Sequence, residues 1–205
     1  VFICLIIFLK VWFLLYEGHR QQFAFGPCPH SPNEYQMHPQ HQEQYLQDWQ
    51  NLYLLEKISK TNKPVLLSSG MSTWDELTSA INILQQGGCS NITLLQCTSE
   101  YPCPPYEVNL RAMEQMRQTF DLPIGYSDHT LGIEVSIAAT ALGASIIEKH
   151  FTLNRELEGP DHAASLNPIE LSHMVRGIRL IETALGDGVK RPTASEEKNM
   201  RVVRK

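Results

Sequence analysis

The sequence predicts an α/β fold with a parallel sheet, built from four consecutive β-α units after about residue 48. Short apolar runs, typical of buried strands, alternate there with longer segments whose apolar residues recur at helical spacing. Capping residues, glycine and proline mark the boundaries between these segments. The pattern fits half of a closed (β/α)8 barrel or part of a doubly wound open sheet, and periodicity alone does not choose between them.

The first unit begins with the apolar run PVLLSS at residues 64–69, which predicts a buried strand. The helix after it is expected to begin at Thr73, because Glu76 three residues later completes a capping box. Two glycines at 87 and 88 end the helix. Its apolar face consists of Leu77, Ile81 and Leu84.

Two further strands are predicted over residues 91–97 (NITLLQC) and 123–127 (PIGYS). A helix of small residues follows the second of these, from about residue 132 to residue 142, and ends at Gly143. The helix between the two strands has an apolar stripe formed by Leu110, Met113, Met116 and Phe120.

The fourth strand is predicted over residues 144–151 (ASIIEKHF). The last helix has Asn167 as its N-cap, Pro168 at its first position and Glu170 as the capping partner. Gly186 ends this helix. Its buried face is expected to contain Leu171, Met174, Val175, Ile178 and Ile181.

The first 47 residues differ in character and are expected to lie outside the fold, which leaves residues 48–205 as the domain. Residues 1–16 are almost wholly apolar but shorter than the roughly 20 residues that a membrane-spanning helix needs. Residues 17–47 are rich in Gln, His and Pro without hydrophobic period, which predicts a disordered linker. Membrane attachment is not expected, and an anchor through residues 1–16 is the minor alternative.

The overall composition is that of a cytoplasmic globular protein. A net charge of −5 provides no electrostatic footprint for nucleic acid. The five cysteines are odd in number and form no C-x-x-C pair, so a reducing compartment is the simpler interpretation.

Polar groups follow the end of every predicted strand, which is where barrels carry their reactive groups. Two of these ends contribute a histidine, His129 and His150. Neutral imidazoles on neighbouring strands can bind one divalent cation, although the same residues could simply cap loops. The four groups are Ser68 and Ser69; Cys97, Thr98 and Ser99; Ser127, Asp128 and His129; and Glu148, Lys149 and His150.

The serines and a loop aspartate suggest substrate contacts. Hydroxyl and backbone N–H groups at strand ends suit a phosphate or carboxylate, but serine is common in ordinary loops. Asp161 can hydrogen-bond a polyol or transfer a proton, unless it is only a solvated loop residue. A serine nucleophile is not predicted, because no G-x-S-x-G elbow is present.

Long collinear runs in this region resemble the sialic acid synthase family. This resemblance implies a TIM-type (β/α)8 barrel, of which the chain carries about the last four β-α units. The runs are KPVLLSSGM (63–71), CTSEYPCPPYEVNLRAM (97–113), GYSDHTLGIEVSIAATALGASIIEKHFTL (125–153), GPDHAASL (159–166) and ETALGDGVKRPTASEEKNM (182–200).

The resemblance also implies a reaction. Phosphoenolpyruvate condenses with an N-acetylated hexose aldehyde such as N-acetylmannosamine, giving a nine-carbon 2-keto sugar acid and phosphate. It implies a divalent metal, Mn²⁺ or Mg²⁺, and a homodimer for the full-length family member. By position, it implies His129 and His150 as metal ligands, Ser68, Ser99 and Ser127 as phosphoenolpyruvate-binding residues, Asp161 and Tyr101 beside the sugar, and Glu148 near the metal.

The chain departs from the family pattern in its first half. Residues 48–64 resemble the helix and loop after the fourth family strand, but that strand and the three before it are not recognisable. The family's antifreeze-like C-terminal domain is also missing. A second hypothesis is therefore a truncated, catalytically incompetent family member or a partial gene model. A third is a synthase for pseudaminic acid, legionaminic acid or a sialic acid 9-phosphate.

Overall fold

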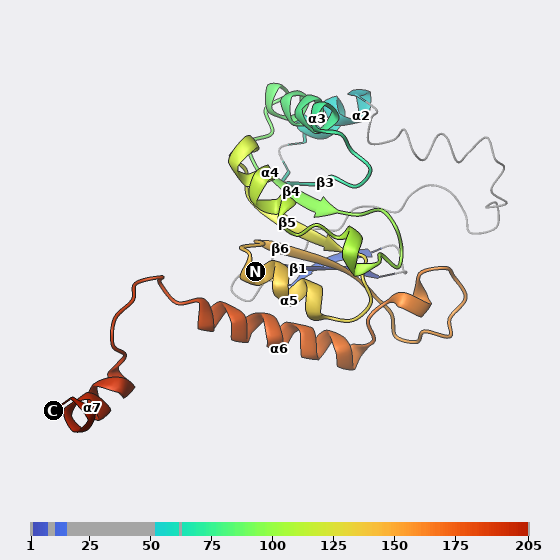
Figure 1. Cartoon of the computed structure of the whole chain (residues 1–205). Helices are drawn as coiled ribbons and strands as arrows, with labels where there is room; N and C mark the ends of the chain where they lie inside the picture. The colour runs from blue at the N-terminus through green and yellow to red at the C-terminus, as the bar shows by residue number, and fades with distance from the viewer. Residues whose placement is uncertain (1, 8–10, 16–51, 62, 205) are drawn as a thin grey trace.

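The computed structural model describes residues 2–7, 11–15, 52–61 and 63–204. The described strands form one sheet in the order β2-β1-β6-β5-β4-β3, in which β1 is Phe2–Ile7 and β2 is Val11–Leu15 (Figure 1). All four predicted strands are present and pair in parallel with their sequence neighbours. Their bounds are Val65–Ser68 for β3, Ile92–Cys97 for β4, Ile124–Asp128 for β5 and Ile146–Phe151 for β6.

Helix α2 precedes β3, and one of the helices α3 to α6 follows each of the strands β3 to β6 along the chain. In space, α2 and α3 lie near β3, and α5 and α6 lie near β6 (Figure 1). Two of the predicted N-caps are confirmed, because the side chains of Thr73 and Asn167 accept hydrogen bonds from the first turns of α3 and α6. The helices are α2 (Leu52–Ser59), α3 (Trp74–Gln86), α4 (Ala112–Phe120), α5 (Glu134–Ala141), α6 (Pro168–Leu185) and α7 (Ala194–Val203).

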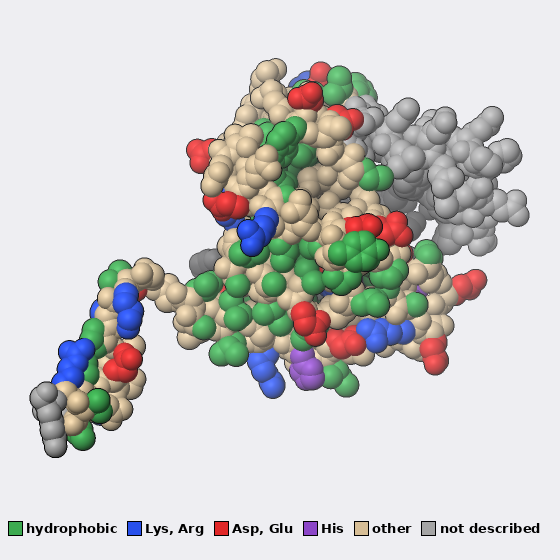
Figure 2. Space-filling view, in the orientation of Figure 1, with side chains coloured by type: hydrophobic (Ala, Val, Ile, Leu, Met, Phe, Trp, Pro, Cys, Tyr) green, Lys and Arg blue, Asp and Glu red, His purple; other side chains and the backbone are tan. Residues whose placement is uncertain are grey.

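Helix α7 was not among the predicted elements. Thr193 and Glu196 form a capping box at its N-terminus, a signal that was present in the sequence. Figures 1 and 2 show α7 set apart from the sheet at the C-terminal end of the chain. A helix that lies apart from the sheet needs no continuous apolar face, so the hydrophobic period that identified the other helices did not identify α7.

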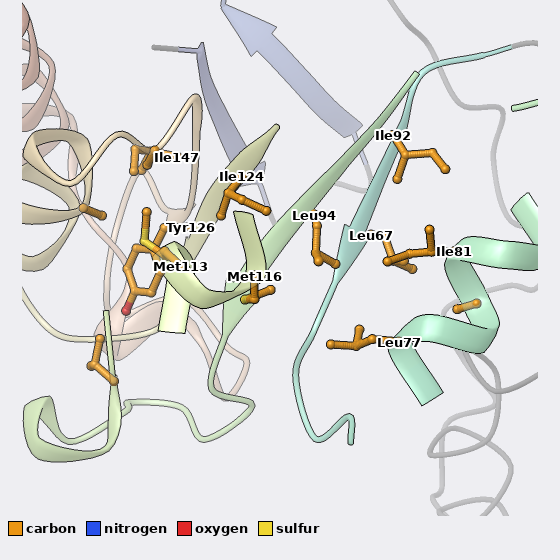
Figure 3. Close-up of a cluster of buried hydrophobic side chains, with 14 of the residues drawn as sticks. Leu67, Leu77, Ile81, Ile92, Leu94, Met113, Met116, Ile124, Tyr126 and Ile147 are labelled. Carbon is orange, nitrogen blue, oxygen red and sulfur yellow. The ribbon is translucent and has the colours of Figure 1, made fainter. Parts of the chain in front are cut away.

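The main core lies between one face of the sheet and the helices (Figure 3). Alternate strand residues such as Leu67, Leu94 and Ile147 point into it. The opposite face carries a small cluster of Leu95, Ile146 and Leu66. Helices packed on one face of four parallel strands are the arrangement of a half barrel, whereas a doubly wound sheet has helices on both faces. The helix residues in the main core include Leu77, Ile81, Leu84, Met113, Met116, Met174 and Ile178.

The apolar leader contributes two strands to the sheet. Strand β1 (Phe2–Ile7) pairs in parallel with β6, and β2 (Val11–Leu15) pairs antiparallel with β1. Residues 2–7 and 11–15 therefore lie within the sheet, although the first 47 residues were expected to lie outside the fold. The physical reason is that β6 without a neighbour would leave a row of backbone groups unpaired. The predicted linker at 17–47 lies outside the described residues. No helix among those described is long and apolar enough to cross a membrane.

The face of the sheet that carries Leu95 and Ile146 is the inner face of the half barrel, and Gly125 keeps it tightly packed. A Cβ atom there would lie 2.5 Å from Leu95 Cδ2 and 2.7 Å from the Ile146 carbonyl oxygen. We expect Gly125→Ala to lower the free energy of unfolding by about 1–3 kcal/mol, because the backbone carbonyl cannot move aside. Urea unfolding measures the change. Gly177→Ala is the control, since its Cβ would meet only the flexible end of Ile137. An equal loss in both variants would contradict the prediction.

Candidate functional site

The carboxyl ends of β4, β5 and β6 bring a layer of polar side chains to the inner face of the sheet. The backbone register pairs Cys97 with Ser127 and Ser127 with Glu148. These residues lie two positions beyond Leu95 and Ile146, so they share the inner face with them. His150, two residues after Glu148, lies on the same face, and His129 follows directly after the end of β5.

The two predicted metal-binding histidines lie together. The centroids of the His129 and His150 rings are 5.3 Å apart, with an angle of 71° between the ring planes. Tyr101 packs against both, at 4.3 Å from the His150 ring and 5.4 Å from the His129 ring. The three rings form one aromatic cluster at the strand ends.

The loop after β6 joins this cluster through Asp161. The Asp161 carboxylate lies 3.8 Å from His150 Nδ1. The Tyr101 hydroxyl is 3.3 Å from both the Asp161 carbonyl oxygen and the Ser165 hydroxyl. The predicted sugar-contacting residues, Asp161 and Tyr101, therefore lie beside the histidines.

The hydrogen bonding of His129 determines which ring nitrogen can bind a ligand. Its Nδ1 lies 2.8 Å from the Thr98 carbonyl oxygen, which can only accept a hydrogen bond. Nδ1 therefore carries the proton, and in the neutral ring Nε2 has the free lone pair. Burial, reinforced by the positive charges of His129 and Lys149, lowers the pKa of His150 to about 4. The uncharged His150 ring and the Nε2 atom of His129 are therefore the candidate metal ligands.

Glu148 is a buried carboxyl beside this pair. The Ser127 hydroxyl donates a hydrogen bond of 2.7 Å to its Oε1 atom. Burial raises the pKa of Glu148, while hydrogen bonding by Ser127 and the charge of His129 oppose the shift. Burial likewise raises the pKa of Cys97, which favours the thiol and gives no support to a nucleophilic role.

The three predicted phosphoenolpyruvate-binding serines occupy different environments. Ser127 is buried on β5, whereas Ser68 at the end of β3 and Ser99 after β4 are exposed. The loops carrying the last two approach closely, because a Cβ atom at Gly70 would lie 2.2 Å from Ser99 Oγ. A cavity of about 560 Å³ adjoins Cys97 and Ser99 between α3 and α4, but neither histidine lines it.

A comparison with protein families matches residues 47–190 to the model of the NeuB family. The chain belongs to the NeuB family. The match covers strands β3 to β6 and both histidines, and it confirms the family resemblance that the sequence motifs indicated.

Curated relatives of the chain include proteins named as synthases of legionaminic acid, N-acetylneuraminate 9-phosphate and pseudaminic acid. The chain is 53% identical over 157 residues to the N,N'-diacetyllegionaminic acid synthase of Campylobacter jejuni, covering 76% of this chain and 47% of that protein. It is 45% identical over 144 residues to the human N-acetylneuraminate-9-phosphate synthase, covering 70% of this chain and 40% of the human protein. The chain therefore spans about half the length of these relatives or less.

A solved structure shows the same architecture. The N-acetylneuraminic acid synthetase of Leptospira borgpetersenii, crystallised with citrate, superposes with a TM-score of 0.69 and 37% identity. The superposition covers 76% of this chain and 54% of that one. The fold is accordingly an α/β half barrel that corresponds to part of a complete NeuB enzyme.

The donor atoms of the site fit a divalent cation only in part. Two imidazoles meet at the strand ends, and imidazole nitrogens suit first-row divalent ions. Among the described residues, no group of three or more His, Cys, Asp and Glu side chains could hold a metal. The remaining coordination positions would fall to water, to substrate or to residues beyond these four strands.

Asp128 and Lys149 lie at the ends of predicted strands but have no role in the predicted site. They form an ion pair of 3.0 Å on the helix side of the sheet, with side chains that are 0% and 1% exposed. A signal was available, because each residue directly precedes one of the two histidines and their charges are opposite. Only the strand register shows that they face each other.

The raised pKa of Glu148 has a consequence for stability in the metal-free NeuB chain. Because the folded-state pKa lies above the unfolded value, the protonated form stabilises the fold at low pH. That contribution is lost as pH rises above 4.5, the usual value for glutamate, and through the folded-state pKa. Raising the pH from about 5 to about 8 should therefore lower the free energy of unfolding of the original chain more than that of Glu148→Gln, because glutamine does not titrate.

Urea unfolding in the presence of a chelator measures this difference between the two pH values. Glu197→Gln, at an exposed position of α7, is the control and should behave as the original chain does. An identical pH dependence in the original chain and in Glu148→Gln would refute the prediction.

Proposed function

We propose that this chain forms the metal-binding and substrate-binding rim of a sugar acid synthase. The reaction condenses phosphoenolpyruvate and water with N-acetylmannosamine or a related N-acyl amino sugar, releasing phosphate and a nine-carbon 2-keto sugar acid. The observation that carries the proposal is the meeting of His129 and His150 at the strand ends, 5.3 Å apart. A pair of imidazoles beside a buried carboxyl and a polar loop suits a cation-assisted carbonyl reaction.

His129 and His150 would hold the divalent cation, Mn²⁺ or Mg²⁺. When bound, the cation would polarise the aldehyde oxygen that becomes negatively charged as the new carbon–carbon bond forms. The Thr98 carbonyl orients His129 by accepting its Nδ1 proton, which leaves Nε2 for ligation. Glu148 lies two residues before His150 on the same face of β6, where its carboxylate would lie near the cation.

The exposed hydroxyls of Ser68 and Ser99, together with Ser127, would bind phosphoenolpyruvate. They lie at the ends of three adjacent strands, so one anion could contact all of them. Asp161 and Tyr101 would contact the sugar, since both lie beside His150 on the open side of the site. An acidic side chain and a phenol ring are suited to a polyol.

The nature of the acceptor sugar is the finer part of the proposal. The relatives named above act, by their names, in legionaminic acid and N-acetylneuraminate 9-phosphate synthesis. We infer an N-acylated amino sugar, with N-acetylmannosamine first and phosphorylated or legionaminic and pseudaminic acid precursors as alternatives. The same proposal includes a synthase-type region that begins near residue 48, with β1 and β2 as additions to its sheet, a cytoplasmic location and a homodimer of the full-length protein.

A second candidate function is that of a catalytically incompetent relative. The small number of metal ligands favours it. The described residues bring two imidazoles together, but no group of three His, Cys, Asp or Glu side chains that could hold a metal. In that case the chain would bind a cation or phosphoenolpyruvate without turning over.

Phosphate release tests the proposal. The purified chain is incubated with phosphoenolpyruvate, N-acetylmannosamine and MnCl₂, and phosphate is measured over time. Release that needs both the sugar and the metal is the expected result. Calorimetric binding of phosphoenolpyruvate without turnover would favour the incompetent relative. Neither binding nor release would overturn both functions.

A further inference from the structure

We propose that the buried ion pair of Asp128 and Lys149 is a positioning device that sets the spacing of His129 and His150. The inference rests on the proposed function for the role of the two histidines. It concerns residues on the opposite face of the sheet, which touch neither substrate nor metal.

The strand register places this pair directly beside the histidines. Asp128 and Lys149 are the last paired positions of β5 and β6, and each is followed by one of the two histidines. Asp128 Oδ2 and Lys149 Nζ are 3.0 Å apart. Side chains alternate across a strand, so clamping these two residues on the helix side sets the position of the next residue on the inner side.

The ion pair also holds the chain just after His129. Lys149 Nζ donates a hydrogen bond of 2.5 Å to the Thr130 carbonyl oxygen. Asp128 Oδ1 accepts from the Thr130 backbone N–H at 2.8 Å and from the Thr130 hydroxyl at 2.7 Å. Both ends of the pair therefore contact Thr130, and His129 lies between anchored neighbours.

A third contact ties the pair to helix α5. The Ser136 hydroxyl donates a hydrogen bond of 2.5 Å to Asp128 Oδ2, and Ser136 is fully buried. The carboxylate thus has a partner from its own loop, from α5 and from β6. A network with this many satisfied groups is rigid, which suits a part whose task is to hold geometry.

Stability alone does not account for such a pair. A buried ion pair contributes little more to stability than apolar residues of the same volume, because desolvation offsets the attraction between the charges. An apolar pair would pack the same space without directional contacts to Thr130 and Ser136. The geometry therefore points to positioning.

The double variant Asp128→Leu/Lys149→Met tests the inference, since it removes both charges and replaces them with apolar side chains. We expect it to remain folded and to bind Mn²⁺ roughly 10–100-fold more weakly in calorimetry. In the metal-free protein, NMR should show faster exchange of the His129 Nδ1 proton and a weaker contact between the two imidazole rings. The control is Asp187→Asn/Arg191→Met, which removes an exposed ion pair far along the chain.

Failure of the positioning role and failure of the proposed function would give different results. Unchanged proton exchange and ring contact in the double variant would overturn the positioning role, whatever the metal does. If the original chain binds no Mn²⁺, the metal site of the proposed function fails, and the NMR comparison still decides the positioning. Should the double variant not fold, Thr130→Val is measured instead. It removes one hydroxyl donor to Asp128, and unchanged exchange there would likewise overturn the inference.

Discussion

Replacing Lys149 alone by methionine is expected to lower the free energy of unfolding by about 3–5 kcal/mol. The variant leaves the Asp128 carboxylate buried at 0% exposure without its cationic partner. Its hydrogen bonds to Thr130 and Ser136 remain, but they do not neutralise a charge away from water. A domain of this size has a total stability of about 5–15 kcal/mol, so the loss would be a large part of it.

Urea unfolding at neutral pH measures this loss, and the double variant is its control. Asp128→Leu/Lys149→Met should be much closer to the original chain than Lys149→Met is, because no charge is left buried without a partner. Arg191→Met, at an exposed ion pair, should show no measurable change. If Lys149→Met and Arg191→Met were equally stable, the buried pair would not have the energetic character assigned to it.

Replacing either His129 or His150 by alanine is expected to abolish stoichiometric Mn²⁺ binding. With two imidazoles as the described protein ligands, removing one leaves a single nitrogen, which is too few for a specific site. Free Mn²⁺ is followed by electron paramagnetic resonance, and circular dichroism checks that each variant is folded.

The matched control is His173→Ala, at an exposed position of α6. It should bind Mn²⁺ as the original chain does, because His173 lies on a helix rather than at the strand ends. Full occupancy of the metal in both His129→Ala and His150→Ala would refute the assignment of these residues as ligands.

Much of the fold was predictable from local signals. The four strands lie within one or two residues of the predicted apolar runs. Thr73 and Asn167 cap the helices they were expected to cap, because a capping box needs only residues three positions apart. Periodicity also identified the buried helix faces, such as the one formed by Met113 and Met116.

Other features depend on pairing between distant segments. The apolar run at the start of the chain is too short for a membrane-spanning helix and was expected to lie outside the fold, but residues 2–7 pair with β6. An apolar run of this kind is compatible with a strand or a buried helix, and the free edge of β6 decides between them. No local pattern specifies which edge a strand will join.

The histidine site also has features that the sequence determined and features that only the tertiary structure decided. The sequence by itself determined that four strands end in polar residues and that two of these are histidines, because strand ends follow from hydrophobic runs and turn residues. Only the tertiary structure decided that His129 and His150 meet and that His129 Nδ1–H donates a hydrogen bond to the Thr98 carbonyl oxygen. It also decided that Asp128 and Lys149 form a buried ion pair on the other face of the sheet. The reason is physical. Strand register and burial create these contacts, and both arise only when segments far apart in the chain pack together.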